Sequence, residues 1–161
     1  MATPGARSKP LFISYSHKDQ EWYEQFAEIL HASALGAWSD SKIEVSQNWD
    51  TTIQDALSEA RIALLLISPA FLSSEYIRNR ELPRILHAHK EEKLAVMWVR
   101  VRPIPESIIP KELRALQTFD IQGSATRSLS SLTAGEAASE ISAICEHIIG
   151  QTEFEGSGQS H

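Results

Sequence analysis

The chain has little cysteine and no long apolar run. Cys145 is its single cysteine, so neither a disulfide framework nor a cysteine-based metal site is expected, and a reducing, cytoplasmic setting fits. No apolar run has the length needed to span a membrane, and residues 1–10 lack the apolar core of a signal peptide. These absences predict a cytoplasmic protein with no membrane partner.

Basic residues are also in the minority. The 15 Lys and Arg are outnumbered by 21 Asp and Glu, which gives a net charge of -6 at pH 7. This balance argues against direct nucleic-acid binding as the main function. The hydrophobic fraction of 42% and the length of 161 residues suit one soluble domain with its own core.

Several motifs of familiar enzymes are missing. The sequence has no GxGxxG, no GxxxxGK[ST] and no GxSxG, which disfavours dehydrogenases, kinases and serine hydrolases. A receiver-type phosphate acceptor would need acids where the first and third strands end, and the chain has Ser14 and Ser68 there. His87 and His89 diverge on a helix, so they predict a solvated face and no metal site. We expect no prosthetic group.

Apolar runs that alternate with helical patterns predict an α/β fold. Two runs, 62–67 and 94–99, are apolar throughout, as in central parallel strands buried on both faces. The prediction is a flavodoxin-like three-layer fold, with a five-stranded parallel sheet in the order 2-1-3-4-5 flanked by helices. The expected strands are 11–15, 37–40, 62–67, 94–99 and 118–121, and the expected helices begin near 16, 48, 71, 112 and 133.

The two ends of the chain are expected to lie outside this domain. Residues 1–9 are predicted to be a disordered lead-in, and 10–149 the folded domain. Residues 150–161 are polar and contain several glycines, which predicts a flexible tail or a linker to a downstream domain.

Glu81 is the main candidate for chemistry. It follows the strand 62–67, and in open α/β sheets ligands bind at the carboxyl ends of the strands. Pro83 is expected to break or kink the helix and to bias Leu82 away from helical geometry, which would hold Glu81 at a helix start. The alternative interpretation is an ordinary first-turn acid favoured by the helix dipole.

A lone carboxylate in such a crevice suits one kind of bond cleavage. Glycosidic cleavage passes through an oxocarbenium-like state that a carboxylate stabilises. When the leaving group is already cationic, as is the nicotinamide of NAD+, no general acid is needed. Aromatic side chains could stack on flat rings or simply pack in the core; they are Tyr15, Trp38, Trp49 and Tyr76.

The sequence resembles a bacterial TIR (Toll/interleukin receptor) domain over about residues 10–149. Its anchors are the segments 12–19, 38–49, 53–60 and 66–82, each weak alone and specific in their order and spacing. Two departures concern the site. Tyr76 and Ile77 replace the common Trp-Cys pair, with one extra residue before Glu81, and Glu44 to Gln47 lacks the usual loop glycine.

The resemblance implies an activity and a set of site residues. Many family members cleave NAD+ with the glutamate that Glu81 matches, and they self-associate through the loop that corresponds to 41–48. The implied nicotinamide pocket is Ser14, Tyr15, Ser16, Asp40, Lys42, Ile43 and Trp49, to which we add Tyr76.

Two functions from different classes follow. The first is an NAD+ glycohydrolase or ADP-ribosyl cyclase, switched on by self-association in bacterial anti-phage immunity, with a sensor or oligomerisation domain as partner. The second is a non-catalytic TIR–TIR interaction module. Glu81, with Ser and Asp partners nearby, favours the enzyme.

Overall fold

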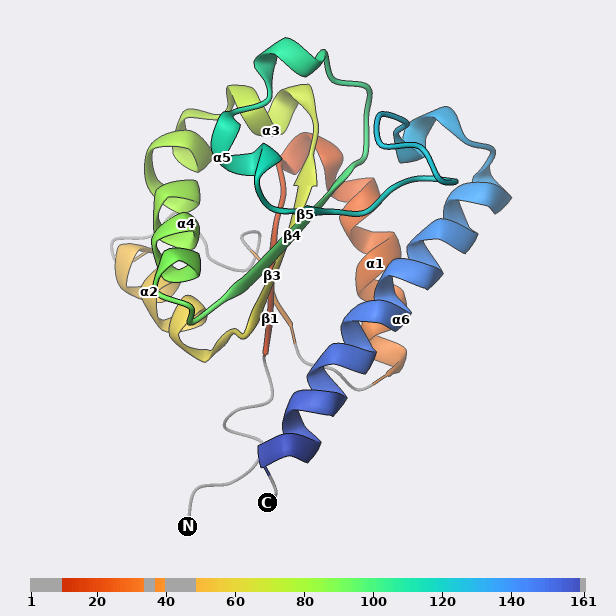
Figure 1. Ribbon diagram of the computed structural model, residues 1–161. Helices are drawn as coiled ribbons and strands as arrows, with labels where there is room; N and C mark the ends of the chain where they lie inside the picture. The colour runs from red at the N-terminus through yellow and green to blue at the C-terminus, as the bar shows by residue number, and fades with distance from the viewer. Residues whose placement is uncertain (1–9, 34–36, 40–48, 160–161) are drawn as a thin grey trace.

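The computed structural model describes residues 10–33, 37–39 and 49–159, and side chains within 10–33 and 54–152. One parallel sheet lies between two layers of helices, with α2 and α4 on one face and α1 and α6 on the other (Figure 1). The strands are β1 (Leu11–Ser14), β2 (Ala37–Ser39), β3 (Ile62–Ile67), β4 (Ala95–Arg100) and β5 (Gln117–Thr118). The α-helices are α1 (Gln20–Ala32), α2 (Trp49–Glu59), α3 (Pro69–Ser73), α4 (Leu82–Lys90), α5 (Lys111–Arg114) and α6 (Ala134–Gln159).

Every strand pairing in the sheet is parallel, which confirms the prediction of an α/β fold with a helix-flanked parallel sheet. The hydrogen-bonded order is β2-β1-β3-β4-β5. In the register, Ser14 at the end of β1 lies opposite Leu65 of β3, and Ile67 lies opposite Arg100 of β4. The outermost strands are short, since β2 has three residues and β5 has two.

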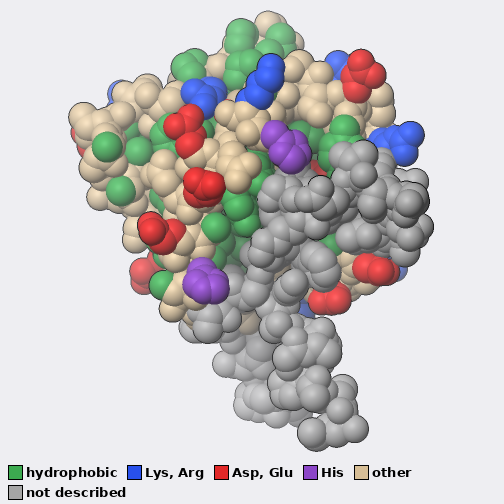
Figure 2. All heavy atoms as spheres, turned by 180° about the vertical axis from the view of Figure 1, so that it is seen from behind, with side chains coloured by type: hydrophobic (Ala, Val, Ile, Leu, Met, Phe, Trp, Pro, Cys, Tyr) green, Lys and Arg blue, Asp and Glu red, His purple; other side chains and the backbone are tan. Residues whose placement is uncertain are grey.

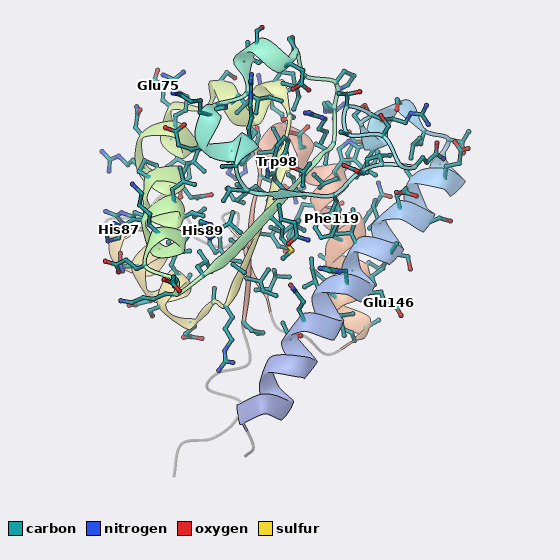
Figure 3. All side chains as sticks on the ribbon, viewed as in Figure 1. Glu75, His87, His89, Trp98, Phe119 and Glu146 are labelled. Atoms are coloured by element: carbon teal, nitrogen blue, oxygen red, sulfur yellow. The ribbon has the colours of Figure 1, made fainter. Side chains whose placement is uncertain are left out.

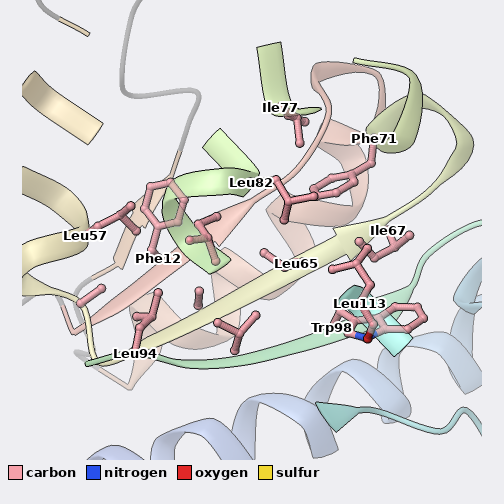
Figure 4. Packing of buried hydrophobic residues seen from close by; sticks show 14 of the residues in the cluster. Phe12, Leu57, Leu65, Ile67, Phe71, Ile77, Leu82, Leu94, Trp98 and Leu113 are labelled. Atoms are coloured by element: carbon pink, nitrogen blue, oxygen red, sulfur yellow. The ribbon is translucent and has the colours of Figure 1, made fainter. Parts of the chain in front are cut away.

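Two hydrophobic clusters cover the two faces of the sheet. Successive residues of β3 alternate between them, because side chains on a strand point to opposite faces in turn. Leu65 and Ile67 pack with Phe71, Leu82 and Trp98 in the first cluster, which Figure 4 shows from close by. Leu64 and Leu66 pack on the other side, among side chains from α1 and α6.

The last helix begins as its sequence predicts. The Thr133 amide donates to Glu136 Oε1 at 3.0 Å, and the Glu136 amide donates to Thr133 Oγ1 at 3.2 Å. This is a reciprocal capping box, which satisfies two amides at the start of α6.

The C-terminal stretch departs from its expected form. A flexible tail was predicted from residue 150, whereas α6 continues to Gln159. Adding a residue to an existing helix forms one hydrogen bond for each residue fixed. The buried anchors Ile144 and Ile148 therefore let the helix run on into a sequence that is poor in helix formers.

The fifth strand is shorter than predicted and lies one residue earlier. It ends at Thr118, and Ile121 instead forms an isolated bridge with Ser124. Gln122 and Gly123 have positive φ angles of 52° and 79° and turn the chain back between them.

Within the residues that are described, no helix has the length and apolar character needed to cross a membrane.

Candidate functional site

Glu81 is buried at the carboxyl edge of the sheet. Its exposed fraction is 0%, and it is the final residue of the helical turn η4 (Ile77–Glu81), immediately before α4. Ser14, the last residue of β1, donates a hydrogen bond from Oγ to Glu81 Oε1. The end of β1 and the helical segment after β3 are thus joined through this carboxylate.

Burial changes the acidity of Glu81. Loss of hydration raises the pKa of its carboxyl from 4.5 to about 7, against smaller lowering contributions from the hydroxyls of Ser14 and Tyr76. Among the described residues, its second oxygen, Oε2, has no hydrogen-bond partner with good geometry. Glu81 is therefore a fully buried carboxyl whose pKa is raised to about 7.

The helical segment around Glu81 differs from the prediction at Pro83. No break occurs: Leu82 has helical angles of -60° and -43°, and Pro83 is the second residue of α4. The preceding turn is instead one residue wider than an α-helical turn, because the Leu82 amide bonds to the Ile77 carbonyl. Glu81 is the last residue before α4, but the helical run continues through it, so the expected break that would place it at a helix start is absent.

A second carboxylate–serine pair lies at the same edge. Ser68, after β3, donates from Oγ to Asp19 Oδ2, and the same Oγ accepts from the Phe71 amide at 3.0 Å. Arg102, after β4, donates from Nε to Asp19 Oδ1 at 2.6 Å and reaches Glu21 at 2.8 Å. Asp19 has an exposed fraction of 0%, so this network ties together the segments after β1, β3 and β4.

Two members of this network, Asp19 and Ser68, stand out in the sequence for other reasons. The spacing of Ser16 and Asp19 is that of a capping box, and Ser68 stands where a strand is expected to end. In the structure Ser16 Oγ accepts from the Lys18 amide at 3.2 Å instead, and α1 begins after Asp19. The signal in the sequence is a polar residue at the end of an apolar strand, which places that residue at the carboxyl edge of the sheet. Arg102 gave no signal, because an arginine in a loop ordinarily lies in solvent.

The structure places the described site candidates in different surroundings. Ser14 contacts Glu81, and Tyr76 is half-buried close to it. Ser16 is nearly buried at the start of the turn after β1. The Tyr15 ring is fully buried and stacks on Tyr23, with 4.4 Å between ring centres. Tyr15 lies in the cluster beneath α1 and α6, which favours the packing interpretation for its ring.

The remaining candidates cannot be placed in the same way. Asp40, Lys42 and Ile43 lie outside the described residues, as does Asn48, which was expected to cap α2. Trp49 is the first residue of α2, but its side chain lies outside the described part. The structure thus brings together Glu81, Ser14 and Tyr76, and leaves the loop 41–48 as a prediction.

The histidines of α4 have local partners. Figure 3 shows His87 and His89 on this helix. The His89 ring lies 2.9 Å from the Leu94 carbonyl, and His87 lies 3.2 Å from Glu91. In the part of the chain that is described, no three His, Cys, Asp or Glu residues group closely enough to hold a metal ion.

The surface carries both signs of charge. On the face drawn in Figure 2, acidic and basic side chains are interspersed outside the grey region and do not form one continuous basic area. This arrangement agrees with the net charge of -6.

Fold and site together define an α/β domain that carries a buried acid at the ligand-binding edge of a parallel sheet. Comparison with known families matches residues 11–133 to the TIR domain, a span of more than half the chain. The protein belongs to the TIR domain family. This family includes both NAD+-cleaving enzymes and non-catalytic signalling modules, and its members commonly self-associate.

One curated relative is similar to part of the chain. It is named "Uncharacterized protein y4lF", from Sinorhizobium fredii (strain NBRC 101917 / NGR234), and is 26% identical over 96 residues. The match covers 57% of this chain and 30% of the relative. The chain therefore spans about a third of the length of that relative.

Proposed function

We propose that this TIR domain cleaves the bond between nicotinamide and ribose in NAD+, acting as an NAD+ nucleosidase. The observation that carries the proposal is Glu81, a buried carboxylate bonded to Ser14 at the carboxyl edge of the sheet. A carboxylate held in an apolar setting stabilises a developing positive charge more strongly than one in water.

In the proposed reaction, Glu81 acts in its ionised form beneath the ribose. Nicotinamide leaves as a neutral ring, the ribose carbon becomes cationic, and the negative charge of the Glu81 carboxylate stabilises that cation. Ser14 holds one oxygen and so fixes the orientation of the carboxylate. Attack by water gives ADP-ribose, and attack by a nitrogen of the adenine gives a cyclic isomer.

The rest of the proposed pocket comes from the family resemblance. Tyr76 and Ser16 lie at the edge where Glu81 is buried, and they are joined in the proposal by residues of the loop after β2 and the start of α2. Those residues are Asp40, Lys42, Ile43 and Trp49. The loop 41–48 also contacts a second copy, so that self-association completes the site, and the domain acts as a cytoplasmic effector in anti-phage defence.

The test is to incubate concentrated protein with NAD+ and a crowding agent. Chromatography then measures the nicotinamide that is released. Glu81→Gln is expected to lower turnover by about a hundredfold to a thousandfold, the usual effect of removing one key electrostatic group. The matched control is Glu75→Gln, an exposed acid six residues earlier (Figure 3), which should leave turnover unchanged.

Two results would contradict the proposal. Turnover that survives Glu81→Gln would show that another group performs the chemistry. No release by the wild-type protein, even when clustered, would favour the non-catalytic interaction module.

A further inference from the structure

The turn that ends at Glu81 is wider than its neighbours. The Leu82 amide bonds to the carbonyl of Ile77, five residues back, whereas an α-helix bonds four residues back. Ile77 and Leu82 are both buried in the same hydrophobic cluster, and both are labelled in Figure 4. Such wide turns are rare and are frequent at functional sites.

Pro83 accounts for this geometry. Proline has no amide hydrogen, and inside an α-helix its ring clashes with the carbonyl four residues earlier, here that of Asn79. Widening the preceding turn by one residue moves that carbonyl away from the ring. The helix can then continue into α4 without a break.

The extra residue sets the direction of Glu81. An α-helix turns by about 100° per residue, so one inserted residue rotates the segment before the turn by about that angle relative to α4. Leu82 and Ile85 anchor α4 in the core, and Phe71 and Ile77 anchor the segment before it. With both sides anchored, closing the turn to α-helical spacing would force Ile77 or Glu81 out of its buried position.

We propose that Pro83 is a positioning residue for Glu81: because its ring and its missing amide hydrogen exclude an α-helical hydrogen bond from position 83 to the Asn79 carbonyl, it holds the wide turn that directs the carboxylate to Ser14. This inference rests on the proposed function, since it deepens the role of the same site. The side chain of Pro83 has no polar group that could take part in the proposed reaction, so its role is to position Glu81.

The experiment restores the missing amide with Pro83→Ala and, separately, Pro83→Ser. Couplings across hydrogen bonds in NMR spectra identify which carbonyl the Leu82 amide bonds. We expect Ile77 in the wild type and Arg78 in both variants. NMR titration of carboxyl-labelled protein measures the pKa of Glu81. This pKa should fall from about 7 toward 4.5 in both variants as the side chain leaves its buried position.

The kinetics of NAD+ cleavage are the second measurement. The kcat for NAD+ at pH 7 should fall at least tenfold in both variants, with a smaller change in KM. The matched control, Pro110→Ala, removes a proline from the start of α5 and should change none of these quantities.

The two proposals fail in distinguishable ways. If the Leu82 amide still bonds Ile77 in the variants, or if the pKa of Glu81 or kcat is unchanged, Pro83 is not a positioning residue. If the wild type does not cleave NAD+, the proposed function fails, and the hydrogen-bond register and the pKa still decide whether Pro83 positions Glu81.

Discussion

Two opposing influences act on the carboxylate of Glu81. Burial disfavours its ionised form, while the hydroxyl of Ser14 favours it. The proposed chemistry needs the ionised form, so NAD+ cleavage should decline as the pH falls below about 7. A cationic substrate bound at this site would lower that midpoint.

The raised pKa of Glu81 also predicts how stability depends on pH. A folded-state pKa above the unfolded value favours folding below pH 4.5, and this contribution is lost as the pH rises through about 7. Glu81→Gln, which cannot ionise, should therefore be more stable than wild type at pH 8, by up to about 3 kcal/mol, and similar at pH 4. Urea denaturation at both pH values measures the difference.

The control for this comparison is Glu24→Gln, which changes an exposed acid on α1. It should shift stability little at either pH. A Glu81→Gln protein that is less stable than wild type at pH 8 would contradict a raised pKa.

Ser14→Ala tests the hydrogen bond to the carboxylate. Removing a donor that favours the ionised form should raise the pKa of Glu81 further and move the pH–activity curve to higher pH. At pH 7 we expect turnover to fall about tenfold, as for the loss of one hydrogen bond to a charged group. The exposed Ser73→Ala is the control, and an unshifted curve in Ser14→Ala would refute the assigned role.

At this scale the sequence predicts some residues and misses others. Glu81 could be predicted because it follows one apolar strand and Ser14 because it lies at the end of another, and parallel strands end at one edge. The partnership of Asp19 with Ser68 and Arg102 could not, because it joins segments 49 and 83 residues apart. Spacing along the chain carries no signal for such a contact.

Among the helices, the sequence predicts local capping patterns but not the wide turn before α4. The capping box at Thr133 follows from the sequence because all its partners lie within three residues. The wide turn before α4 does not, since Pro83 is compatible with a break, a kink or a widened turn. The structure shows the last of these, with Ile77 and Leu82 buried in the same cluster.

Thr133→Ala tests the capping box. The variant should lose about 1 kcal/mol of stability, because the Glu136 amide loses its side-chain acceptor. Thermal unfolding with Thr126→Ala as control measures this effect. Equal stability of the two variants would show that water replaces the cap without cost.

For the molecule as a whole, β3 connects both helical layers. Leu64 and Leu65 are neighbours in sequence, yet they belong to opposite clusters. Neither layer can therefore lose its packing without exposing a strand on which the other depends. The alternation of a fully apolar strand is visible in the sequence, which is why the layered fold could be predicted more fully than the site.

This sharing predicts one cooperative unfolding transition. Leu64→Ala and Leu65→Ala should each cost about 2–5 kcal/mol, and each should shift both layers together. Methyl NMR signals of Ile85 in the first layer and Ile144 in the second should disappear at the same urea concentration. Separate midpoints for the two signals would show that the layers unfold independently.

Cys145 is a natural probe of the contact between α6 and α1. The thiol is the only one in the sequence, it is buried against the Phe26 carbonyl of α1, and burial raises its pKa to about 12. Alkylating reagents attack the thiolate, so labelling must wait until α6 lifts from α1. The rate of alkylation, followed by mass spectrometry over time, therefore reports the rate at which that helical layer opens. No probe has to be introduced.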